Sequence, residues 1–288
     1  MRWTFLNKHA AALTVAALAV LVAACTTSGS SNHPRVVSVA CGNTGAGFAA
    51  WKEAFAQEAI AKGIDANVVR SSLEGVTYSA RVISLDRNQS AFKADFETFY
   101  ARRVSADLIA RGKRFMRTHR ATLERIEAQY GVPPEVLVSI LALESSFGRH
   151  QGNLSIIRSL ATLAYDCRRQ QFFSAELLDA LRVIERGDLS RARMVGAWAG
   201  EYGMTQFLMS RYYAHAVDFD GSGYADLRNS FPDVLASTAS VLRADGWQRG
   251  QPWGKGTANW RVIETWNRAD VYVETIATLA YALRDGRA

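Results

Sequence analysis

The sequence predicts a mainly α-helical fold, and two observations support this prediction. Apolar residues recur with helical spacing from Gly47 to near the C-terminus, whereas runs that alternate with a period of two residues are scarce. The chain has 288 residues, of which 49% are hydrophobic. This is enough apolar material for the core of one large domain or two small ones. The sequence contains no internal repeat.

The apolar spacing predicts the helices in a definite order along the chain. Phe48, Trp51, Phe55 and Ile60 indicate the first helix. Further helical segments are expected at 92–119 (as one or two helices), 121–129, 135–147, 156–164, 172–185, 233–244 and 272–284. We expect the loops between these helices to contain the functional residues.

The first 25 residues have the features of a secretory signal peptide. Arg2 and Lys8 supply positive charge, and residues 10–24 form an apolar run that is too short for an ordinary membrane span. The run ends in Val-Ala-Ala-Cys, which resembles a bacterial lipobox, so Cys25 is expected to become the lipidated first residue. Thr26, rather than Asp, follows it, and by similarity to lipoprotein sorting patterns this favours the outer membrane. Ordinary cleavage, with Cys25 removed or left as a free thiol, is the alternative.

Residues 26–46 are rich in Ser, Thr, Gly and Asn, a composition that predicts a flexible tether. The formal net charge is +7, and removing Arg2 and Lys8 lowers it by two, to +5. A basic surface suits an acidic polymer. Nucleic acid fits poorly, because export separates the protein from it and the sequence has no basic-aromatic motif. A cell-wall polymer with acidic peptide stems fits better, and a basic surface that only aids solubility is the alternative.

Two further cysteines, Cys41 and Cys167, remain after the predicted lipidation site. An even number of cysteines in an exported protein favours a disulfide, which here would close a long loop. Two buried thiols are the alternative.

Glu144 lies on the apolar face of the helix expected at 135–147. Leu137, Ile140, Leu141 and Glu144 follow the i, i+3, i+4, i+7 pattern of one helical face. A carboxyl group in that position either loses solvation or faces a cleft, and loss of solvation raises its pKa. A carboxyl group that stays protonated near neutral pH can protonate the leaving oxygen of a glycosidic bond. A buried glutamate with a structural partner is the alternative.

The segment 196–207 is rich in glycine and aromatic residues. Glycines let the backbone approach a ligand closely, and aromatic rings offer flat faces on which sugars can stack. The pattern therefore indicates a carbohydrate-binding loop. A tight crossing of two helices, made by small residues, is the alternative.

The segment from Asp218 to Asp226 matches most of a calcium-binding loop. Oxygen-bearing side chains occupy loop positions 1, 3, 5 and 9, and a glycine occupies position 6. Asn229 replaces the usual glutamate at position 12, and Asp233 is a candidate for the missing carboxylate. An Asx-rich turn without a metal is the alternative.

Several blocks of the sequence together resemble the lytic murein transglycosylases of the membrane-bound B type, over about residues 47–285. In chain order, these blocks are 131–134 (Gly-Val-Pro-Pro), 144–148 (Glu-Ser-Ser-Phe-Gly), 160–166, 168–169, 196–207, 216–221, and 266–267 followed by Tyr272. No single block is decisive, but the presence of all of them in this order behind a lipobox is specific to the family.

The resemblance implies a lysozyme-like α fold with an EF-hand-like calcium loop. The catalytic domain would cover 47–288, with the lysozyme-like core at about 126–288 packed on N-terminal helices. The family cleaves the β-1,4 bond from N-acetylmuramic acid to N-acetylglucosamine in peptidoglycan and leaves a 1,6-anhydro ring. Glu144 would protonate the leaving oxygen and then act as base on the 6-hydroxyl, with the substrate's N-acetyl group assisting. No catalytic cofactor is implied.

The resemblance also assigns the remaining site residues. The implied substrate contacts are Gln206, Phe207, Asn267, Tyr272, Arg168, Arg169 and Ala197. Tyr272 would orient the acid or the N-acetyl group. One of the two arginines would meet a peptide-stem carboxylate, and the alternative for that pair is a solvated start of a helix. The implied calcium ligands are Asp218, Asp220, Ser222, the Tyr224 carbonyl and Asp233. The implied partners are peptidoglycan strands and, through the lipid anchor, the membrane, in a periplasmic location.

Some positions depart from the family pattern. Ala197 stands where many members have serine, and residues 207–211 differ from the usual loop after Gln206. Trp266 stands where tyrosine also occurs. Glu201 is a second acidic residue near the expected cleft, which we interpret as structural. A hydrolytic muramidase, with Glu201 or an unassigned aspartate as base, and a non-catalytic peptidoglycan-binding lipoprotein are the alternative functions.

Overall fold

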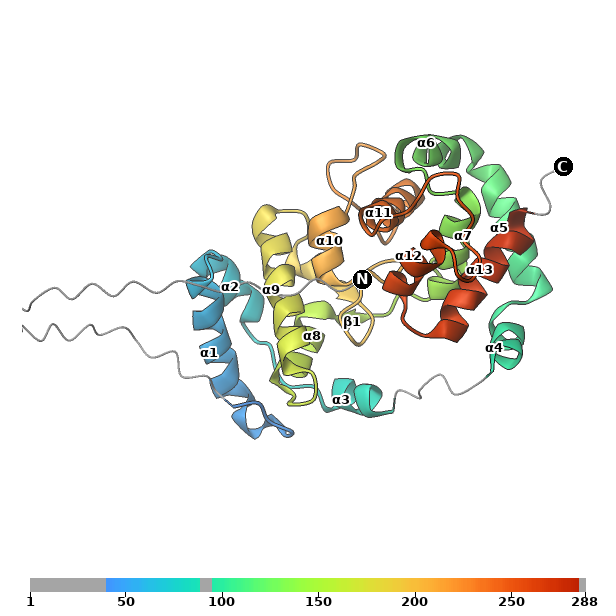
Figure 1. The fold of residues 1–288 in the computed structure, drawn as a ribbon. Helices are drawn as coiled ribbons and strands as arrows, with labels where there is room; N and C mark the ends of the chain where they lie inside the picture. The colour runs from blue at the N-terminus through green and yellow to red at the C-terminus, as the bar shows by residue number, and fades with distance from the viewer. Residues whose placement is uncertain (1–39, 89–94, 285–288) are drawn as a thin grey trace, which may run out of the picture. The chain divides into compact units, whose positions relative to one another are not determined.

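The structure is a computed structural model that describes residues 40–88 and 95–284 (Figure 1). The predicted signal peptide, the lipidation site Cys25 and residues 26–39 of the predicted tether lie outside the described residues. Residues 92–94 of one predicted helical segment also lie outside them.

The described residues form thirteen α-helices, two 3-10 helices and one pair of short strands, which confirms the predicted mainly α fold. The first half of the chain contains η1 (Gly45–Gly47), α1 (Phe48–Ala61), α2 (Ala66–Leu73), α3 (Ala80–Arg87), α4 (Phe96–Arg103), α5 (Ala106–Thr118), α6 (Arg120–Tyr130) and α7 (Pro134–Ser145). The second half contains β1 (Leu154–Ser155), α8 (Ile156–Tyr165), α9 (Gln170–Arg186), η2 (Arg191–Arg193), β2 (Val195–Gly196), α10 (Met209–His215), α11 (Phe231–Ala244), α12 (Ala258–Trp266) and α13 (Asp270–Arg284).

Each segment that the apolar spacing predicted as helical contains a helix, and 92–119 contains two, α4 and α5. Four short helices, α2, α3, α10 and α12, were not predicted. Side-chain caps start three of them. Asp65 accepts hydrogen bonds from the first backbone N–H groups of α2, the Ser79 hydroxyl accepts one from α3, and the Thr257 hydroxyl accepts one from α12.

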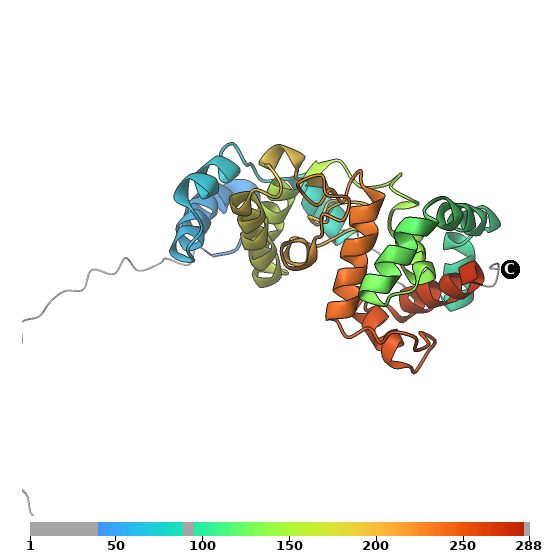
Figure 2. The ribbon, with the colours of Figure 1, turned by 90° about the horizontal axis from the view of Figure 1, so that it is seen from above.

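Helix α7 is the central helix of the core, and it is buried on nearly every side. It packs against α13, α5, α11 and α6 (Figure 2). Residues 134–143 are all buried. The sequence prediction of a single apolar face was therefore incomplete, because polar Ser139 is buried as well and donates its hydroxyl to the Glu135 carbonyl at 2.7 Å. Glu144, near the C-terminal end of the helix, is only partly buried.

Helix α7 ends two residues earlier than predicted. It stops at Ser145, and both Ser146 and Phe147 adopt left-handed backbone conformations, with φ of 53° and 62°. Positive φ is uncommon for residues other than glycine and recurs at functional sites. The turn directly after Glu144 is therefore a sharply defined one.

The N-terminal helices pack against α8 and α9 (Figure 1), and an aromatic cluster joins α1 to α8. Tyr165 of α8 packs edge-on against Phe48 at 5.5 Å between ring centroids and lies 5.8 Å from Trp51. Its hydroxyl accepts a hydrogen bond from the Gly47 N–H at 3.2 Å, and its carbonyl accepts one from Gly42 at 3.0 Å. The end of the predicted tether, from Cys41 onward, is thus fixed to the domain.

The two short strands hold the start of the glycine-rich loop. Leu154 pairs with Gly196 and Ser155 with Val195 in antiparallel register. A Cβ atom at Gly196 would lie 2.0 Å from the carbonyl oxygen of Glu201, so this close approach of backbone requires glycine.

Among residues 40–88 and 95–284, none of the helices combines the length and apolar character needed to cross a membrane.

Candidate active site

Glu144 is held by two hydrogen-bond donors from the C-terminal helices. The indole N–H of Trp266 donates to its Oε1 at 3.0 Å, and its side chain is also hydrogen-bonded to Tyr272. Burial raises the pKa of Glu144 above its ordinary value, and the negative charge of Glu201 raises it further. The two hydrogen bonds and the charge of Arg103 lower the pKa, but burial dominates. The carboxyl group is thus favoured in its protonated form.

The turn between α12 and α13 positions both donors. Trp266 is the last residue of α12, and Tyr272 lies in the first turn of α13 with 3% of its surface exposed. Between them, the Asn267 side-chain oxygen accepts a hydrogen bond from the Ala269 N–H at 3.0 Å. The structure therefore places Tyr272 beside Glu144, and Asn267 lies in the turn that joins the two donors.

Trp266 was noted in the sequence only as a departure, yet it contacts the carboxyl group directly. The buried ring of Phe207 packs edge-on against the indole, with 5.8 Å between ring centroids. The guanidinium group of Arg211 lies 5.2 Å from the centre of the indole ring. Phe207 is 1% exposed, so its observed contact is with Trp266, and it supports the donor rather than presenting a free surface.

Sequence reasoning missed two residues of α4 that reach this site. The Phe99 ring packs edge-on against Tyr272 at 6.1 Å, and the guanidinium of Arg103 lies 5.6 Å from the centre of the Phe99 ring. The positive charge of Arg103 lowers the pKa of both Glu144 and Tyr272, although burial keeps both values raised. No motif in the sequence links α4 to Glu144; only the packing of α4 against α13 brings them together.

Glu201 is a second carboxyl group with unusual surroundings. One oxygen, Oε2, is buried without a hydrogen-bond partner in the described part of the chain. Burial raises the pKa of Glu201, while hydrogen bonds from backbone N–H groups and the charge of Arg169 lower it. The Nε atom of Arg169 is likewise buried without a partner. Its influence on the pKa of Glu144 places Glu201 in the electrostatic environment of the site.

Gln206 lies in a tight turn of the glycine-rich loop. Its backbone is left-handed, with φ of 54°, and its side-chain amide donates to the Gly203 carbonyl at 2.8 Å. Tyr202 and Phe207 on either side exchange backbone hydrogen bonds of 2.8 and 2.9 Å. Ala197 begins the same loop, and its N–H donates to the Glu201 carbonyl at 2.9 Å. The loop is therefore shaped by its own backbone bonds.

Arg168 and Arg169 are both paired with Asp86 of α3. Arg168 Nη2 lies 2.6 Å from Asp86 Oδ1, and Arg169 contacts the same oxygen. Asp86 is 1% exposed, whereas the arginine side chains are 43% and 38% exposed. No pattern in the sequence pointed to this aspartate, because α3 lies about eighty residues earlier in the chain.

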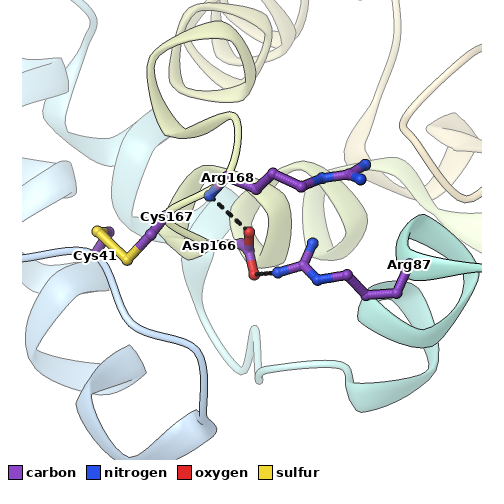
Figure 3. The surroundings of a disulfide bond; sticks show 5 residues. All are labelled: Cys41, Arg87, Asp166, Cys167 and Arg168. Atoms are coloured by element: carbon purple, nitrogen blue, oxygen red, sulfur yellow. Dashed lines mark hydrogen bonds and ion pairs between the residues drawn. A yellow bond between two sulfur atoms is a disulfide. The ribbon is translucent and has the colours of Figure 1, made fainter.

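Cys41 and Cys167 form a disulfide that adjoins this ion-pair cluster. Their Cα atoms are 4.9 Å apart and they are separated by 126 residues in the chain. Cys167 lies between Asp166, which accepts from Arg87 at 2.6 Å, and Arg168 (Figure 3). The bridge therefore joins the N-terminal segment to the turn between α8 and α9.

Three carboxylates of the predicted calcium loop lie together. Ligand oxygens of Asp218, Asp220 and Asp233 lie within 4.8 Å of one another. Asp233 is fully buried at the start of α11, and the other two are exposed. The Ser222 hydroxyl donates to the Tyr224 carbonyl at 3.2 Å, so both groups lie in the same loop. Oxygen donors of this kind suit a hard cation such as Ca²⁺.

In this mainly helical domain, a half-buried carboxyl group with a raised pKa is held by two hydrogen-bond donors, an arrangement that is suited to acid catalysis. The family comparison is specific: the chain belongs to the transglycosylase SLT domain family, whose model matches residues 47–258. This confirms the predicted family and fold.

Individual relatives agree. Membrane-bound lytic murein transglycosylase B of Escherichia coli strain K12 is 34% identical over 148 residues, which is 51% of this chain and 41% of that protein. The chain thus spans less than half the length of that relative. SltB3 from Pseudomonas aeruginosa, solved in complex with NAG-NAM-pentapeptide, is 31% identical with a TM-score of 0.77, covering 83% of this chain and 80% of that one.

A more distant structure supports the fold alone. Escherichia coli lytic transglycosylase Slt35, solved in complex with calcium, is 24% identical with a TM-score of 0.72 and covers 82% of this chain and 93% of that one.

Proposed function

We propose that this protein is a peptidoglycan lytic transglycosylase. It cleaves the β-1,4 bond from N-acetylmuramic acid to N-acetylglucosamine and leaves a 1,6-anhydro ring on the muramic sugar. The observation that carries the proposal is the Glu144 carboxyl group, whose pKa is raised by burial while Trp266 and Tyr272 hold it in place. Family membership and the lytic transglycosylases among its relatives support the same activity.

In the first step, protonated Glu144 donates its proton to the glycosidic oxygen as the bond from C1 of the muramic sugar to that oxygen breaks. Burial raises the pKa of Glu144, which makes its protonated form more available than that of an exposed glutamate. The carboxylate that remains is stabilised by the Trp266 N–H and the hydrogen bond with Tyr272, since both bonds favour the charged form.

In the second step, the Glu144 carboxylate accepts the proton of the 6-hydroxyl as the oxygen of that group bonds to C1. The bond broken at C1 is replaced by the bond to O6, and Glu144 regains its proton, so no water is consumed. One carboxyl group serves as acid and then as base. The electrostatic influence of Arg103 stabilises the intermediate carboxylate further.

Glu201 supports a second candidate, a hydrolytic muramidase on the same fold. A hydrolase needs a base that positions water, and Glu201 has a buried oxygen without a partner in the described residues. Analysis of the released ends separates the two candidates, because only the transglycosylase leaves the 1,6-anhydro ring on the muramic sugar.

The substrate contacts we propose are Gln206, Ala197 and Asn267, together with Arg168 and Arg169. The two arginines share the buried carboxylate of Asp86, yet more than a third of each side chain is exposed. Their outer faces can therefore meet the carboxylate of a peptide stem while Asp86 fixes their position.

We also propose a structural Ca²⁺ held by Asp218, Asp220, Ser222, the Tyr224 carbonyl and Asp233. Three carboxylates within 4.8 Å repel one another, and a divalent cation would offset this repulsion. Bound calcium would tie the loop to α11, and catalysis itself needs no cofactor.

For location, we propose a periplasmic lipoprotein anchored through Cys25, with residues 26–39 as the tether and 47–288 as the catalytic domain. The relative from Escherichia coli is described as membrane-bound, which supports the anchor. The amino-terminal features described above support export.

The Glu144→Gln variant tests the proposal. The amide cannot donate an acidic proton, so lysis of purified sacculi should fall by at least about 10² to 10⁴-fold. Glu53→Gln, at an exposed position of α1, is the matched control and should retain full activity. Thermal unfolding of both variants checks that the fold is intact. Near wild-type lysis by folded Glu144→Gln protein would refute the assignment.

A further inference from the structure

A basic pocket of about 310 Å³ lies between α5 and the turn after α7. Its lining includes three arginines, Arg111, Arg114 and Arg149, together with Phe115, Phe147 and His119. No carboxylate lines it. The pocket is separate from the Asp86 cluster and from the calcium loop carboxylates, so none of the groups discussed above explains it.

Aromatic side chains give the pocket an apolar floor. The Phe115 ring lies 5.5 Å from the Phe147 ring and 4.3 Å from the His119 ring, between centroids. Phe231, the first residue of α11, packs edge-on against Phe115 at 4.9 Å. These contacts fix Phe115 from three elements, so the floor is a built surface rather than a mobile one.

Arg111 is held in the wall of the pocket by three contacts. Its Nε donates to Asp107 at 2.9 Å, and its Nη1 donates to the Ser146 hydroxyl at 3.1 Å. Its guanidinium also lies 5.4 Å from the centre of the Phe147 ring. Ser146 and Phe147 are the two left-handed residues that follow Glu144 by two and three positions. The pocket is thus connected to the end of the catalytic helix.

Arg114 and Arg149, in contrast, are exposed and form no ion pair within the described residues. Burial lowers the pKa of His119, so its imidazole is neutral near pH 7 and adds hydrogen-bonding capacity without charge. Two unpaired guanidinium groups above an aromatic floor suit a carboxylate attached to a short apolar chain, because guanidinium binds carboxylate in a bidentate manner.

We propose that this pocket binds a carboxylate-bearing peptide stem of the peptidoglycan strand held at Glu144. This inference rests on the proposed function. The charge of the pocket complements the acidic stem, its aromatic rings complement alanine methyl and methylene groups, and the Arg111–Ser146 hydrogen bond joins it to the turn that follows Glu144 in the chain. The pocket would make cleavage favour strands that still carry peptides.

Binding in the Glu144→Gln background tests this inference without turnover. Two soluble glycan fragments are compared by calorimetry, one with peptide stems and one from which an amidase has removed them. Arg114→Ala with Arg149→Ala should weaken binding of the peptide-bearing fragment about tenfold and leave binding of the bare fragment unchanged. Arg81→Ala with Arg117→Ala is the matched control, since it removes two exposed arginines outside the pocket and should change neither affinity.

Three outcomes would overturn the inference. Unchanged binding of both fragments would show that the two arginines do not contact the peptide. Equal weakening for both fragments would show an effect on glycan binding or on the fold. Vesicles of phosphatidylglycerol are the third probe. If Arg114→Ala with Arg149→Ala weakens binding to these vesicles but leaves binding of the peptide-bearing fragment unchanged, the pocket binds a lipid surface. The proposed function is measured separately, from the products that the wild-type protein releases from bare glycan.

Discussion

Replacing Cys41 and Cys167 together by serine should destabilise the protein strongly while leaving its native structure in place. The disulfide closes a loop between residues that are 126 positions apart. The chain-entropy relation gives about 5 kcal/mol for a loop of this length, because the bridge removes conformations from the unfolded chain.

The native state should persist because other contacts hold the same segment. The Gly42 N–H donates to the Tyr165 carbonyl at 3.0 Å, and the Gly47 N–H donates to the Tyr165 hydroxyl at 3.2 Å. The loss should therefore fall mainly on the stability of the fold, with little change in the rate of lysis at a temperature where both proteins are folded.

Equilibrium unfolding in urea measures the effect, with Cys25→Ser present in both proteins so that no third thiol interferes. Wild-type protein reduced by a thiol reagent is the control and should lose the same free energy of unfolding. If the free energy of unfolding falls by less than about 1 kcal/mol, and the slopes of this energy against urea concentration are equal for the two proteins, the entropic reasoning is wrong. Two free thiols in protein from the periplasm would refute the bridge itself.

The remaining predictions concern the acid and the metal. Trp266→Phe removes a hydrogen bond that favours the Glu144 carboxylate, so the pKa of Glu144 should rise and the alkaline limit of lysis should move to higher pH. Glu201→Gln removes a neighbouring negative charge, so the pKa of Glu144 should fall and the same limit should move to lower pH. Calcium should raise the melting temperature with a dissociation constant of about 10⁻⁴ to 10⁻³ M, because the bidentate ligand at position 12 is missing. Asp233→Asn should abolish that increase.

Each of these predictions can be contradicted by a specific result. Lysis requires protonated Glu144, so activity declines as the pH rises through its pKa, and the two variants must shift the limit in opposite directions. Shifts in the same direction would contradict the electrostatic account of the site. Identical melting in calcium and in chelator would contradict the metal site.

Local patterns in the sequence predicted the features that depend on neighbouring residues. The helical spacing around Glu144 pointed to the desolvation of its carboxyl group, and the regular oxygen positions from Asp218 pointed to the loop whose carboxylates cluster in space. The family resemblance added Tyr272, which is hydrogen-bonded to Glu144, and Asn267, which follows Trp266 in the turn between α12 and α13.

The features that local patterns did not predict depend on tertiary packing. Arg103 approaches Glu144 only because α4 packs against α13, and Asp86 meets Arg168 across about eighty residues of chain. Helices α2, α3, α10 and α12 have seven to nine residues, so their apolar spacing covers about two turns and gives a weak signal. Trp266 could have been identified from its position next to Asn267.

Digestion of purified sacculi in water labelled with heavy oxygen tests the central claim most directly. Because the 6-hydroxyl replaces water at C1, the released muropeptides should be one water lighter than hydrolysed products and should contain no heavy oxygen at the muramic end. Mass spectrometry of the products measures both properties, with a hydrolytic muramidase as the reference digestion. Muramic ends that retain the water and carry the label would show a hydrolase and contradict the account.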